Sequence, residues 1–170
     1  MAYTYENWLR WEGFDKEKQS FLLERMQDFH QMTKHSPPWK NLHLVKHDNF
    51  GFLYVIKNHL NDKQYVGKKT IKVKHGKVQW QLYWGSSFPL KTDILLNGFE
   101  SFSREIREVF DADELFYAER NFILANRCVS SPDWYNRMVP AVNDEVTYEP
   151  DYMFMPAAGG RLMQKLGVKP

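Results

Sequence analysis

The sequence predicts an α+β fold: a small central antiparallel β-sheet flanked by helices, with an N-terminal helical extension and a C-terminal tail. A β-rich run over residues 52–56, a polar loop and a short second strand over 64–66 form the pattern of a hairpin. Apolar residues recur at helical spacing before and after this hairpin. We expect an N-terminal extension over residues 1–41, a central domain over 42–145 and a tail over 146–170.

Length and composition fit one intracellular domain. A chain of 170 residues buries roughly 70% of the surface that its unfolded form exposes, so it needs no disulfide scaffold. The single cysteine, Cys128, cannot form an internal disulfide, which fits a reducing compartment. Neither a secretory leader nor an apolar run of membrane-spanning length is visible. We therefore expect a cytoplasmic protein with no membrane partner.

Residues 3–35 are expected to be helical and to form an arm or lid. Asp15 can cap a helix, and Ser36-Pro37-Pro38 can end it. The expected apolar stripe of this helix contains Phe21, Leu22, Met26, Phe29 and Met32, together with Arg25.

Residues 68–85 alternate between apolar and polar side chains, which predicts a two-stranded ribbon or a long loop with a turn at His75-Gly76. Seven lysines and no Asp or Glu lie between Lys63 and Thr92. A basic surface of this kind suits the neutralisation of phosphates, although a solvated lysine-rich hairpin is also an ordinary solubility device. The net charge of the whole chain, +2, does not by itself indicate a polyanionic partner.

The remaining chain is expected to contain a helix, a strand and a second helix. These are a short helix that begins at Ser86-Ser87 and Pro89 and ends at Asn97-Gly98, a strand over 102–110, and a helix from about Glu114 to Arg127 capped by Asp113. Beyond Pro132 we expect irregular chain, and residues 149–170 would form an arm or a partner contact.

The segment GFLYVIKNHLNDKQYVGKKT, residues 51–70, resembles the GIY-YIG nuclease family, especially its phage-type homing endonucleases and their free-standing relatives. Phe52-Leu53-Tyr54 stands in place of GIY and Tyr65-Val66-Gly67 in place of YIG. Residues 83–106 are similar to the family's Y-x-G-S turn, short helix and strand, and residues 114–123 to the helix that carries its metal-binding glutamate. Tyr135-Asn136 resembles the aromatic-Asn pair that closes the family core.

This resemblance, which covers residues 52–136, implies a phage-encoded DNA endonuclease that hydrolyses phosphodiester bonds with Mg²⁺ or Mn²⁺ and works in the host cytoplasm. Glu119 would hold the metal. The expected substrate is double-stranded DNA. Because one such site cuts one strand, a homodimer is left open, as is a phage protein partner. The N-terminal helices, with Trp8 and Trp11, would grip DNA or form the dimer contact.

The chemistry assigns further roles within this resemblance. Phosphodiester hydrolysis needs a deprotonated water, a cation at the phosphate and stabilisation of the leaving oxygen. We expect Tyr54 to be the base or to orient the water, and Tyr65 to be its partner. Lys69 shares a strand face with Tyr65 and is the expected phosphate cation. Asn136 would close the core or support Glu119.

Each assignment has a structural alternative. Either tyrosine could be a buried strand aromatic, and Glu119 could be a surface residue in a local ion pair. Many family members carry an arginine several residues after YIG, whereas this chain has the lysine-rich Gly67-Lys68-Lys69-Thr70. The missing arginine favours a rival function, in which a catalytically weak fold is a binding module for nucleic acid or protein. A purely structural virion or assembly protein is a third class.

The candidate DNA contacts are Lys68, Lys72, Lys74, His75, Lys77, Ser86 and Arg104. His75 could equally be an exposed turn residue, and Ser86 a helix cap. Arg104 could instead pair with neighbouring glutamates.

Overall fold

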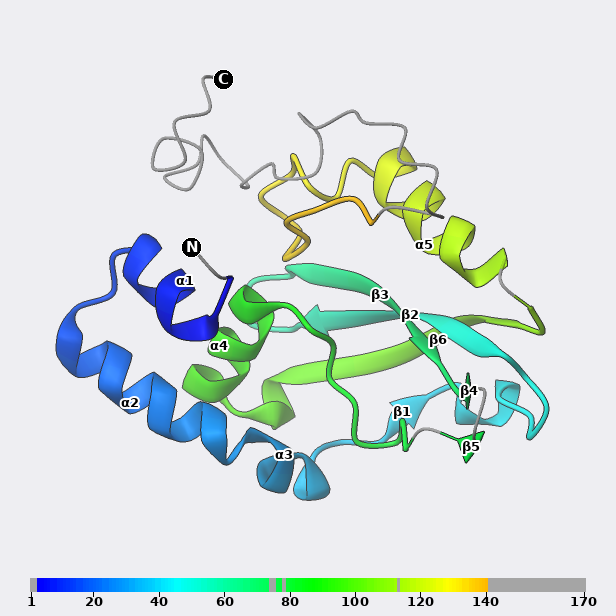
Figure 1. The fold of residues 1–170 in the computed structure, drawn as a ribbon, viewed down its shortest axis with the longest axis horizontal. Coiled ribbons are helices and arrows are strands. Elements are labelled where there is room, and N and C mark those ends of the chain that lie inside the picture. Colours follow the sequence, from blue (N-terminus) through cyan, green and yellow to red (C-terminus); the bar gives the residue numbers. More distant parts are fainter. Residues whose placement is uncertain (1–2, 74–75, 78, 113, 141–170) are drawn as a thin grey trace.

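The computed structural model describes residues 3–73, 76–77, 79–112 and 114–140, without the side chains of 72, 73, 76 and 77. It confirms the α+β fold (Figure 1). A four-stranded sheet has the order β1-β6-β2-β3. The strands are β1 (Trp39–Lys40), β2 (Gly51–Asn58), β3 (Gln64–Thr70) and β6 (Phe102–Phe110).

The predicted hairpin is formed by β2 and β3, which pair antiparallel with Tyr54 opposite Gly67 and Ile56 opposite Tyr65. On its other side β2 pairs antiparallel with β6, with an irregularity between Leu53 and Tyr54. The short β1 is parallel to β6, so the sheet is antiparallel except at this edge. β3 is therefore an edge strand, and this position decides where the site lies.

The N-terminal helices are part of the core rather than a separate arm. The predicted single helix is divided into α1 (Tyr5–Trp11), α2 (Lys16–Gln27), α3 (Phe29–Met32) and the 3₁₀ turn η1 (Thr33–His35). Gly13, with φ of 80°, lies between α1 and α2, and Asp15 caps α2 as predicted, accepting from the Lys18 N–H at 2.8 Å. Leu9 and Leu22 are fully buried in the core that also contains β2.

Two residues show how the N-terminal helices dock. The Tyr5 hydroxyl and the Thr92 Oγ1 lie 2.8 Å apart, which joins α1 to helix α4 (Phe88–Asn97). Phe21 was expected in the apolar stripe, but it is 47% exposed. Leu22, which was expected in the same stripe, does lie on the inward face of α2, because neighbouring helical positions point about 100° apart.

The two faces of the sheet have separate cores. One contains Phe52, Tyr54 and Ile56 with residues of α1 and α4, and the other contains Leu53 and Val55 with residues of α5 (Glu114–Ala125). The short helix and the second helix were both predicted, with Ser87 as the α4 N-cap and Gly98, at φ 82°, after its last turn. The predicted Asp113 cap lies outside the described residues.

The remaining short elements are the 3₁₀ turns η2 (Leu42–Leu44) and η3 (Phe99–Ser101) and the two-residue strands β4 (Lys72–Val73) and β5 (Gly76–Lys77). The pairing of β4 with β5 agrees with the predicted ribbon. None of the described helices has both the length and the apolar character needed to cross a bilayer. The predicted C-terminal tail, residues 146–170, lies outside the described residues.

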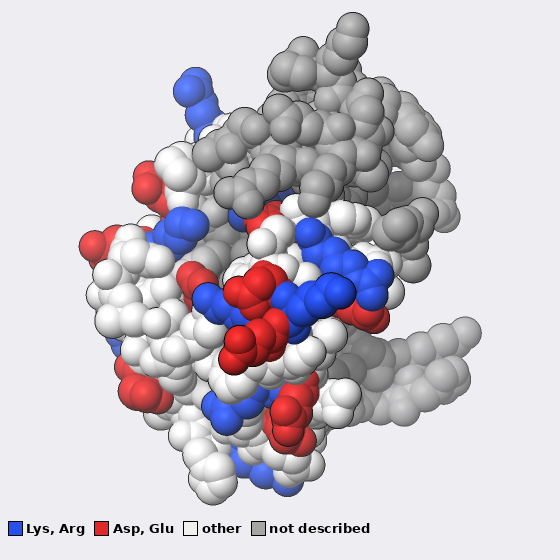
Figure 2. All heavy atoms as spheres, turned by 90° about the vertical axis from the view of Figure 1, so that its left-hand side faces the viewer, with Lys and Arg blue, Asp and Glu red and all other residues white. Residues whose placement is uncertain are grey.

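Charged side chains of both signs are mixed on the side of the molecule shown in Figure 2. Lys and Arg lie among Asp and Glu there, so this face does not form a surface of one sign. The mixed charge on this face does not by itself attract a polyanion. A nucleic-acid contact would therefore depend on individual basic side chains.

Candidate active site

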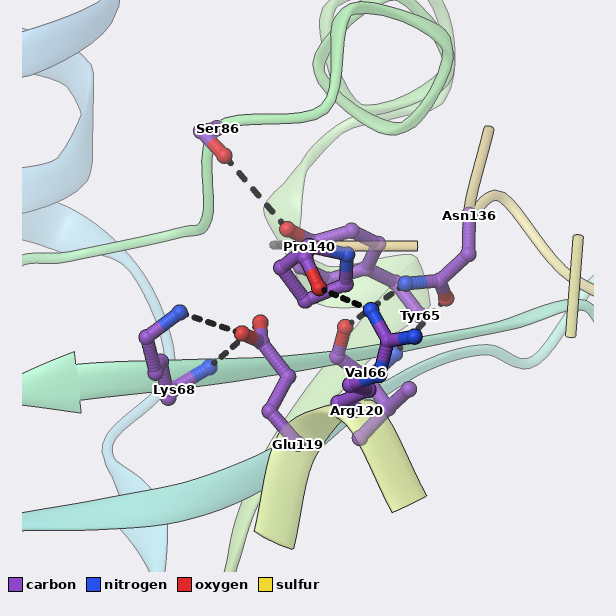
Figure 3. A network of polar contacts seen from close by, with 8 residues as sticks. All are labelled: Tyr65, Val66, Lys68, Ser86, Glu119, Arg120, Asn136 and Pro140. Carbon is purple, nitrogen blue, oxygen red and sulfur yellow. Dashed lines mark hydrogen bonds and ion pairs between the residues drawn. The ribbon is translucent and has the colours of Figure 1, made fainter. Parts of the chain in front are cut away.

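Five of the predicted site residues meet at the outer edge of β3, where a pocket has a volume of about 200 Å³. They are Tyr65, Lys68, Ser86, Glu119 and Asn136, and Figure 3 shows them around the strand. Tyr65 comes from the sheet face that α4 covers, and Glu119 comes from α5 on the other face. The pocket thus lies at the edge of the sheet and is lined by side chains from both of its faces.

The outward-facing backbone of β3 explains how these side chains are held. At the first outward position, Gln64 donates to the Asp133 carbonyl at 2.9 Å and accepts from the Tyr135 N–H at 2.7 Å. Two residues on, Val66 pairs with the side chain of Asn136, and after two more the Lys68 N–H donates to the Glu119 carboxylate at 3.2 Å. One row of edge groups therefore orients both the amide and the carboxylate.

Glu119 is a buried carboxylate, only 8% exposed. Besides the Lys68 N–H, it contacts the Lys68 ammonium, with which it forms an ion pair. The alternative of a surface glutamate in a local ion pair is wrong, since Arg120, its neighbour, donates to the Pro140 carbonyl at 3.1 Å instead. Burial of a carboxylate beside a pocket gives a hard oxygen ligand for a cation.

Lys68, not Lys69, reaches this pocket. Lys69 does share the Tyr65 face, as the strand parity predicted, but its ammonium lies 4.2 Å from the centre of the Tyr83 ring and it does not line the pocket. Burial lowers the pKa of Lys69. Lys69 as the phosphate cation stays a prediction, but Lys68 is the lysine that lies beside Glu119, which approaches the strand from the opposite face.

Tyr65 lines the pocket and lies 3.4 Å from Ser86 between their hydroxyl oxygens. Burial raises the pKa of Tyr65 to about 12, although its hydrogen bond with Ser86 acts in the opposite direction. The phenol is therefore neutral at physiological pH and can both donate and accept a hydrogen bond.

Tyr54 lies behind Tyr65, with ring centroids 6.1 Å apart, and does not line the pocket. It is fully buried, and burial, followed by the nearby Tyr65 and Tyr83, raises its pKa well above the usual value. The prediction that Tyr54 contacts the attacking water is therefore corrected: the central position of β2 places its side chain under the pocket floor, where it supports Tyr65.

Gly67 makes this close packing of two tyrosines feasible. A Cβ on Gly67 would collide with the Tyr54 hydroxyl and lie 2.9 Å from Tyr65 Cε1. Gly85, at φ 80°, would place a Cβ at the same distance from the same Tyr65 atom. The glycine of the YIG-like tripeptide is thus needed for the close approach of the two rings.

Asn136 is 5% exposed and binds the backbone of β3 through both side-chain atoms. Its hydrogen bonds go to Val66 and none goes to Glu119. Of its two predicted roles, the geometry favours closing the core.

Arg104, expected to contact DNA, is a core residue. It is 2% exposed, and its guanidinium donates to the carbonyls of Gln81, Tyr83 and Pro37 at 3.1, 2.8 and 2.7 Å. The rings of Trp39 and Trp84 lie 4.5 and 4.2 Å from its guanidinium carbon. The prediction is wrong because β6 is an interior strand and turns Arg104 toward β1 and the 79–87 loop.

The other candidate DNA contacts remain predictions. Lys74 and His75 lie outside the described residues, as do the side chains of Lys72 and Lys77, whose backbones are in β4 and β5. One charged residue among the described pocket residues escaped the sequence analysis: Arg137 lines the pocket directly after Asn136. Its place beside the aromatic-Asn pair was the available signal.

Among the described residues that line the pocket, Glu119 is the only acidic one. Within the described ranges, no three His, Cys, Asp or Glu residues gather into a metal-binding cluster. Glu119 is the candidate ligand, and Mg²⁺ can be held by one or two carboxylates when waters and a substrate phosphate complete its coordination.

A comparison with protein families finds one match, to the family described as "Putative endonuclease segE, GIY-YIG domain", over residues 33–139. The comparisons with curated proteins and with solved structures gave no match. The matched region contains all four strands of the main sheet, α4 and α5, and it includes Tyr65, Glu119 and Asn136.

Proposed function

The chain belongs to the GIY-YIG endonuclease domain family represented by segE, and from this premise we propose that it is a metal-dependent DNA endonuclease. The reaction would take place in the pocket between Tyr65 and Glu119. The observation that carries the proposal is that a neutral phenol and a lysine from β3 and a buried carboxylate from α5 line one pocket. The resemblance to phage-type members supports a phage-encoded enzyme.

The proposed substrate is double-stranded DNA. Lysines without intervening acids lead from β3 toward α4 in the sequence, which favours contact with a polyanion close to the pocket. Water attacks phosphorus, the bond to the 3′ oxygen breaks, and the products have a 5′ phosphate and a 3′ hydroxyl.

Glu119 would hold Mg²⁺ or Mn²⁺. A bound divalent ion supplies charge neutralisation at the phosphate and favours hydroxide formation from water at neutral pH. The residues fit such an ion, because the carboxylate is fixed by the Lys68 N–H and lines a pocket that also has room for a phosphate.

Tyr65 and Lys68 would act on the reacting groups directly. The Tyr65 hydroxyl lies at the pocket wall and can accept a hydrogen bond from the attacking water while Ser86 holds it in place. The Lys68 ammonium can pass from Glu119 to a phosphate oxygen when the substrate enters, since a lysine side chain is flexible. Tyr54 and Asn136 would position Tyr65 from below and from the strand edge.

Plasmid cleavage tests the proposal. Supercoiled DNA is incubated with Mg²⁺ or Mn²⁺ and with the wild type, Glu119→Gln or Glu114→Gln. Glu114 is an exposed residue of the same helix and provides the matched control. We expect nicked or linear product from the wild type and from Glu114→Gln, and none from Glu119→Gln.

Absence of product from the folded wild type, across both metals and several DNA substrates, would reject the nuclease. Salt-dependent DNA binding without cleavage would then favour the binding module. Equal cleavage by the wild type and Glu119→Gln would retain a nuclease but move its metal ligand elsewhere.

A further inference from the structure

Phosphate binding in the pocket requires a cation, and most of those nearby are already engaged. Lys68 is paired with Glu119, and Lys69 lies on the Tyr83 ring outside the pocket. Neither gives the pocket an uncompensated positive charge.

Two of the nearby arginines are also engaged in contacts within the protein. Arg104 is enclosed in the core by three carbonyls and two indole rings. Arg120 donates to the Pro140 carbonyl and holds the chain after α5 against that helix. Both guanidinium groups therefore stabilise the fold.

Arg137 is different. Unlike Arg104 and Arg120, it lines the pocket. Its Nε is buried, and no residue that the structure describes accepts a hydrogen bond from it, as is also true of the Arg104 Nε in the core. Among the described residues no carboxylate forms an ion pair with Arg137. An unpartnered buried donor is unfavourable, so its retention at a pocket points to a ligand that supplies the acceptor.

The position of Arg137 is fixed by its neighbour. Asn136 is bound to Val66 through two hydrogen bonds, so the backbone of Arg137 is anchored beside β3. Its positive charge also acts on Tyr3, another pocket residue: burial raises the pKa of Tyr3, and the Arg137 charge opposes that increase. The guanidinium is therefore held close to the pocket rather than free in solvent.

We propose that Arg137 binds the phosphate of the nucleic acid in this pocket, through the paired N–H groups of its guanidinium. Such a fork matches two phosphate oxygens, which a lysine ammonium cannot do. Arg137 would take the place of the arginine that is absent after the YIG-like tripeptide. The inference rests on the proposed nuclease function for the identity of the phosphate as the one that is cleaved.

The test compares Arg137→Met, which keeps the length of the side chain, with Arg137→Lys, which keeps the charge without the fork. Arg107→Met is the matched control, because Arg107 is an exposed β6 residue paired with Glu105. Single-turnover cleavage should fall by about 100-fold in Arg137→Met, the usual effect of removing one transition-state donor. Arg137→Lys should recover part of the rate, and Arg107→Met should keep it.

DNA affinity provides a second readout that needs no cleavage. In the Glu119→Gln background, log K is measured against log salt for each arginine variant. Loss of one phosphate contact should reduce the slope by about 1 in Arg137→Met and leave it unchanged in Arg137→Lys. If Arg137→Met does not fold, Arg137→Lys alone tests the proposal. We then expect it to cleave more slowly than the wild type while the slope of log K against log salt stays unchanged.

The two proposals fail in different ways. A wild type that cleaves, with Arg137→Met and Arg137→Lys equally active and all slopes the same, overturns the role of Arg137 and leaves the nuclease standing. A wild type that binds but does not cleave overturns the nuclease. In that case a slope reduced by about 1 in Arg137→Met still supports Arg137 as a phosphate ligand, and an unchanged slope rejects it.

Discussion

The side-chain amide of Asn136 pairs with both backbone groups of Val66, accepting from the N–H at 3.0 Å and donating to the C=O at 2.8 Å. Its two hydrogen bonds replace those that a further strand would make at the edge of β3. The N–H and C=O of the buried Val66 therefore both have a partner. Tyr65 precedes Val66 in the chain and Lys68 follows two residues later. The geometry of the pocket therefore depends on this amide.

Replacing Asn136 with Ala should destabilise the protein by about 2–3 kcal/mol, because two buried backbone groups lose their partners. Urea denaturation gives the free energy of unfolding. Asn126→Ala is the matched control, since its amide bonds one exposed helix carbonyl, and it should change stability by less than about 0.5 kcal/mol. Equal effects of the two substitutions would show that Val66 does not need the amide.

The hairpin, β6, α4 and α5 could be predicted because each depends on a local pattern. A continuous β-rich run marks β2, and helical spacing with Ser87 and Gly98 at the ends marks α4. The docking of α1 and α2 could not be predicted in this way. An apolar stripe shows that a helix packs against something, and only the tertiary fold decides that Leu22 enters the main core.

The sequence predicted several of the polar residues that line the pocket, but not how the fold places them relative to one another. Parity along β3 placed Lys69 beside Tyr65 correctly, but it contained no information about the side from which α5 brings Glu119. Arg104 looked like a groove contact because strand parity cannot distinguish an interior strand from an exposed one. Its aromatic partners are distant in sequence and meet it only in the fold.

Arg104→Ala is expected to destabilise the protein by about 3 kcal/mol, since it removes the guanidinium that donates to the part-buried carbonyls of Tyr83 and Pro37 and shares the Gln81 carbonyl with the Trp39 indole. Burial lowers the pKa of Arg104 to about 10, so the guanidinium remains charged at neutral pH. Thermal unfolding measures the loss, and Arg107→Ala should be nearly neutral. A folded Arg104→Ala protein with normal stability and weakened DNA binding would instead restore the groove contact.

Lys68→Met should bind Mn²⁺ more tightly than the wild type when DNA is absent. In the wild type the ammonium forms an ion pair with Glu119, and a cation must displace it. Removal of a partly buried competitor should raise the affinity by about 10-fold, which corresponds to about 1.4 kcal/mol. Isothermal titration calorimetry measures it.

Lys57→Met is the control for Lys68→Met, because it removes an ammonium whose partner, Asp62, is exposed, and neither residue lines the pocket. Its Mn²⁺ affinity should match that of the wild type. If Lys68→Met also leaves the affinity unchanged, Lys68 does not compete for the metal ligand. Cleavage by Lys68→Met should nevertheless fall, since the same side chain is expected to reach the phosphate.

Tyr65→Phe should separate the chemical role of the hydroxyl from its role in stability. At neutral pH the substitution removes one long hydrogen bond to Ser86, so the free energy of unfolding should change by less than about 1 kcal/mol. Cleavage should fall by about 100-fold or more, because the water loses its partner. Retention of the wild-type rate would exclude the Tyr65 hydroxyl from the reaction.

Alkaline pH provides an independent check on the burial of this phenol. The folded pKa of about 12 lies above the unfolded value of about 10. Burial of the neutral phenol therefore contributes stability that is fully present below pH 10 and is lost as pH rises toward 12. Between pH 9 and pH 11 the free energy of unfolding of the wild type, taken relative to that of Tyr65→Phe, should fall by about 1.4 kcal/mol. Urea denaturation at the two pH values measures this difference, and a constant difference would mean that Tyr65 is accessible to water and titrates normally.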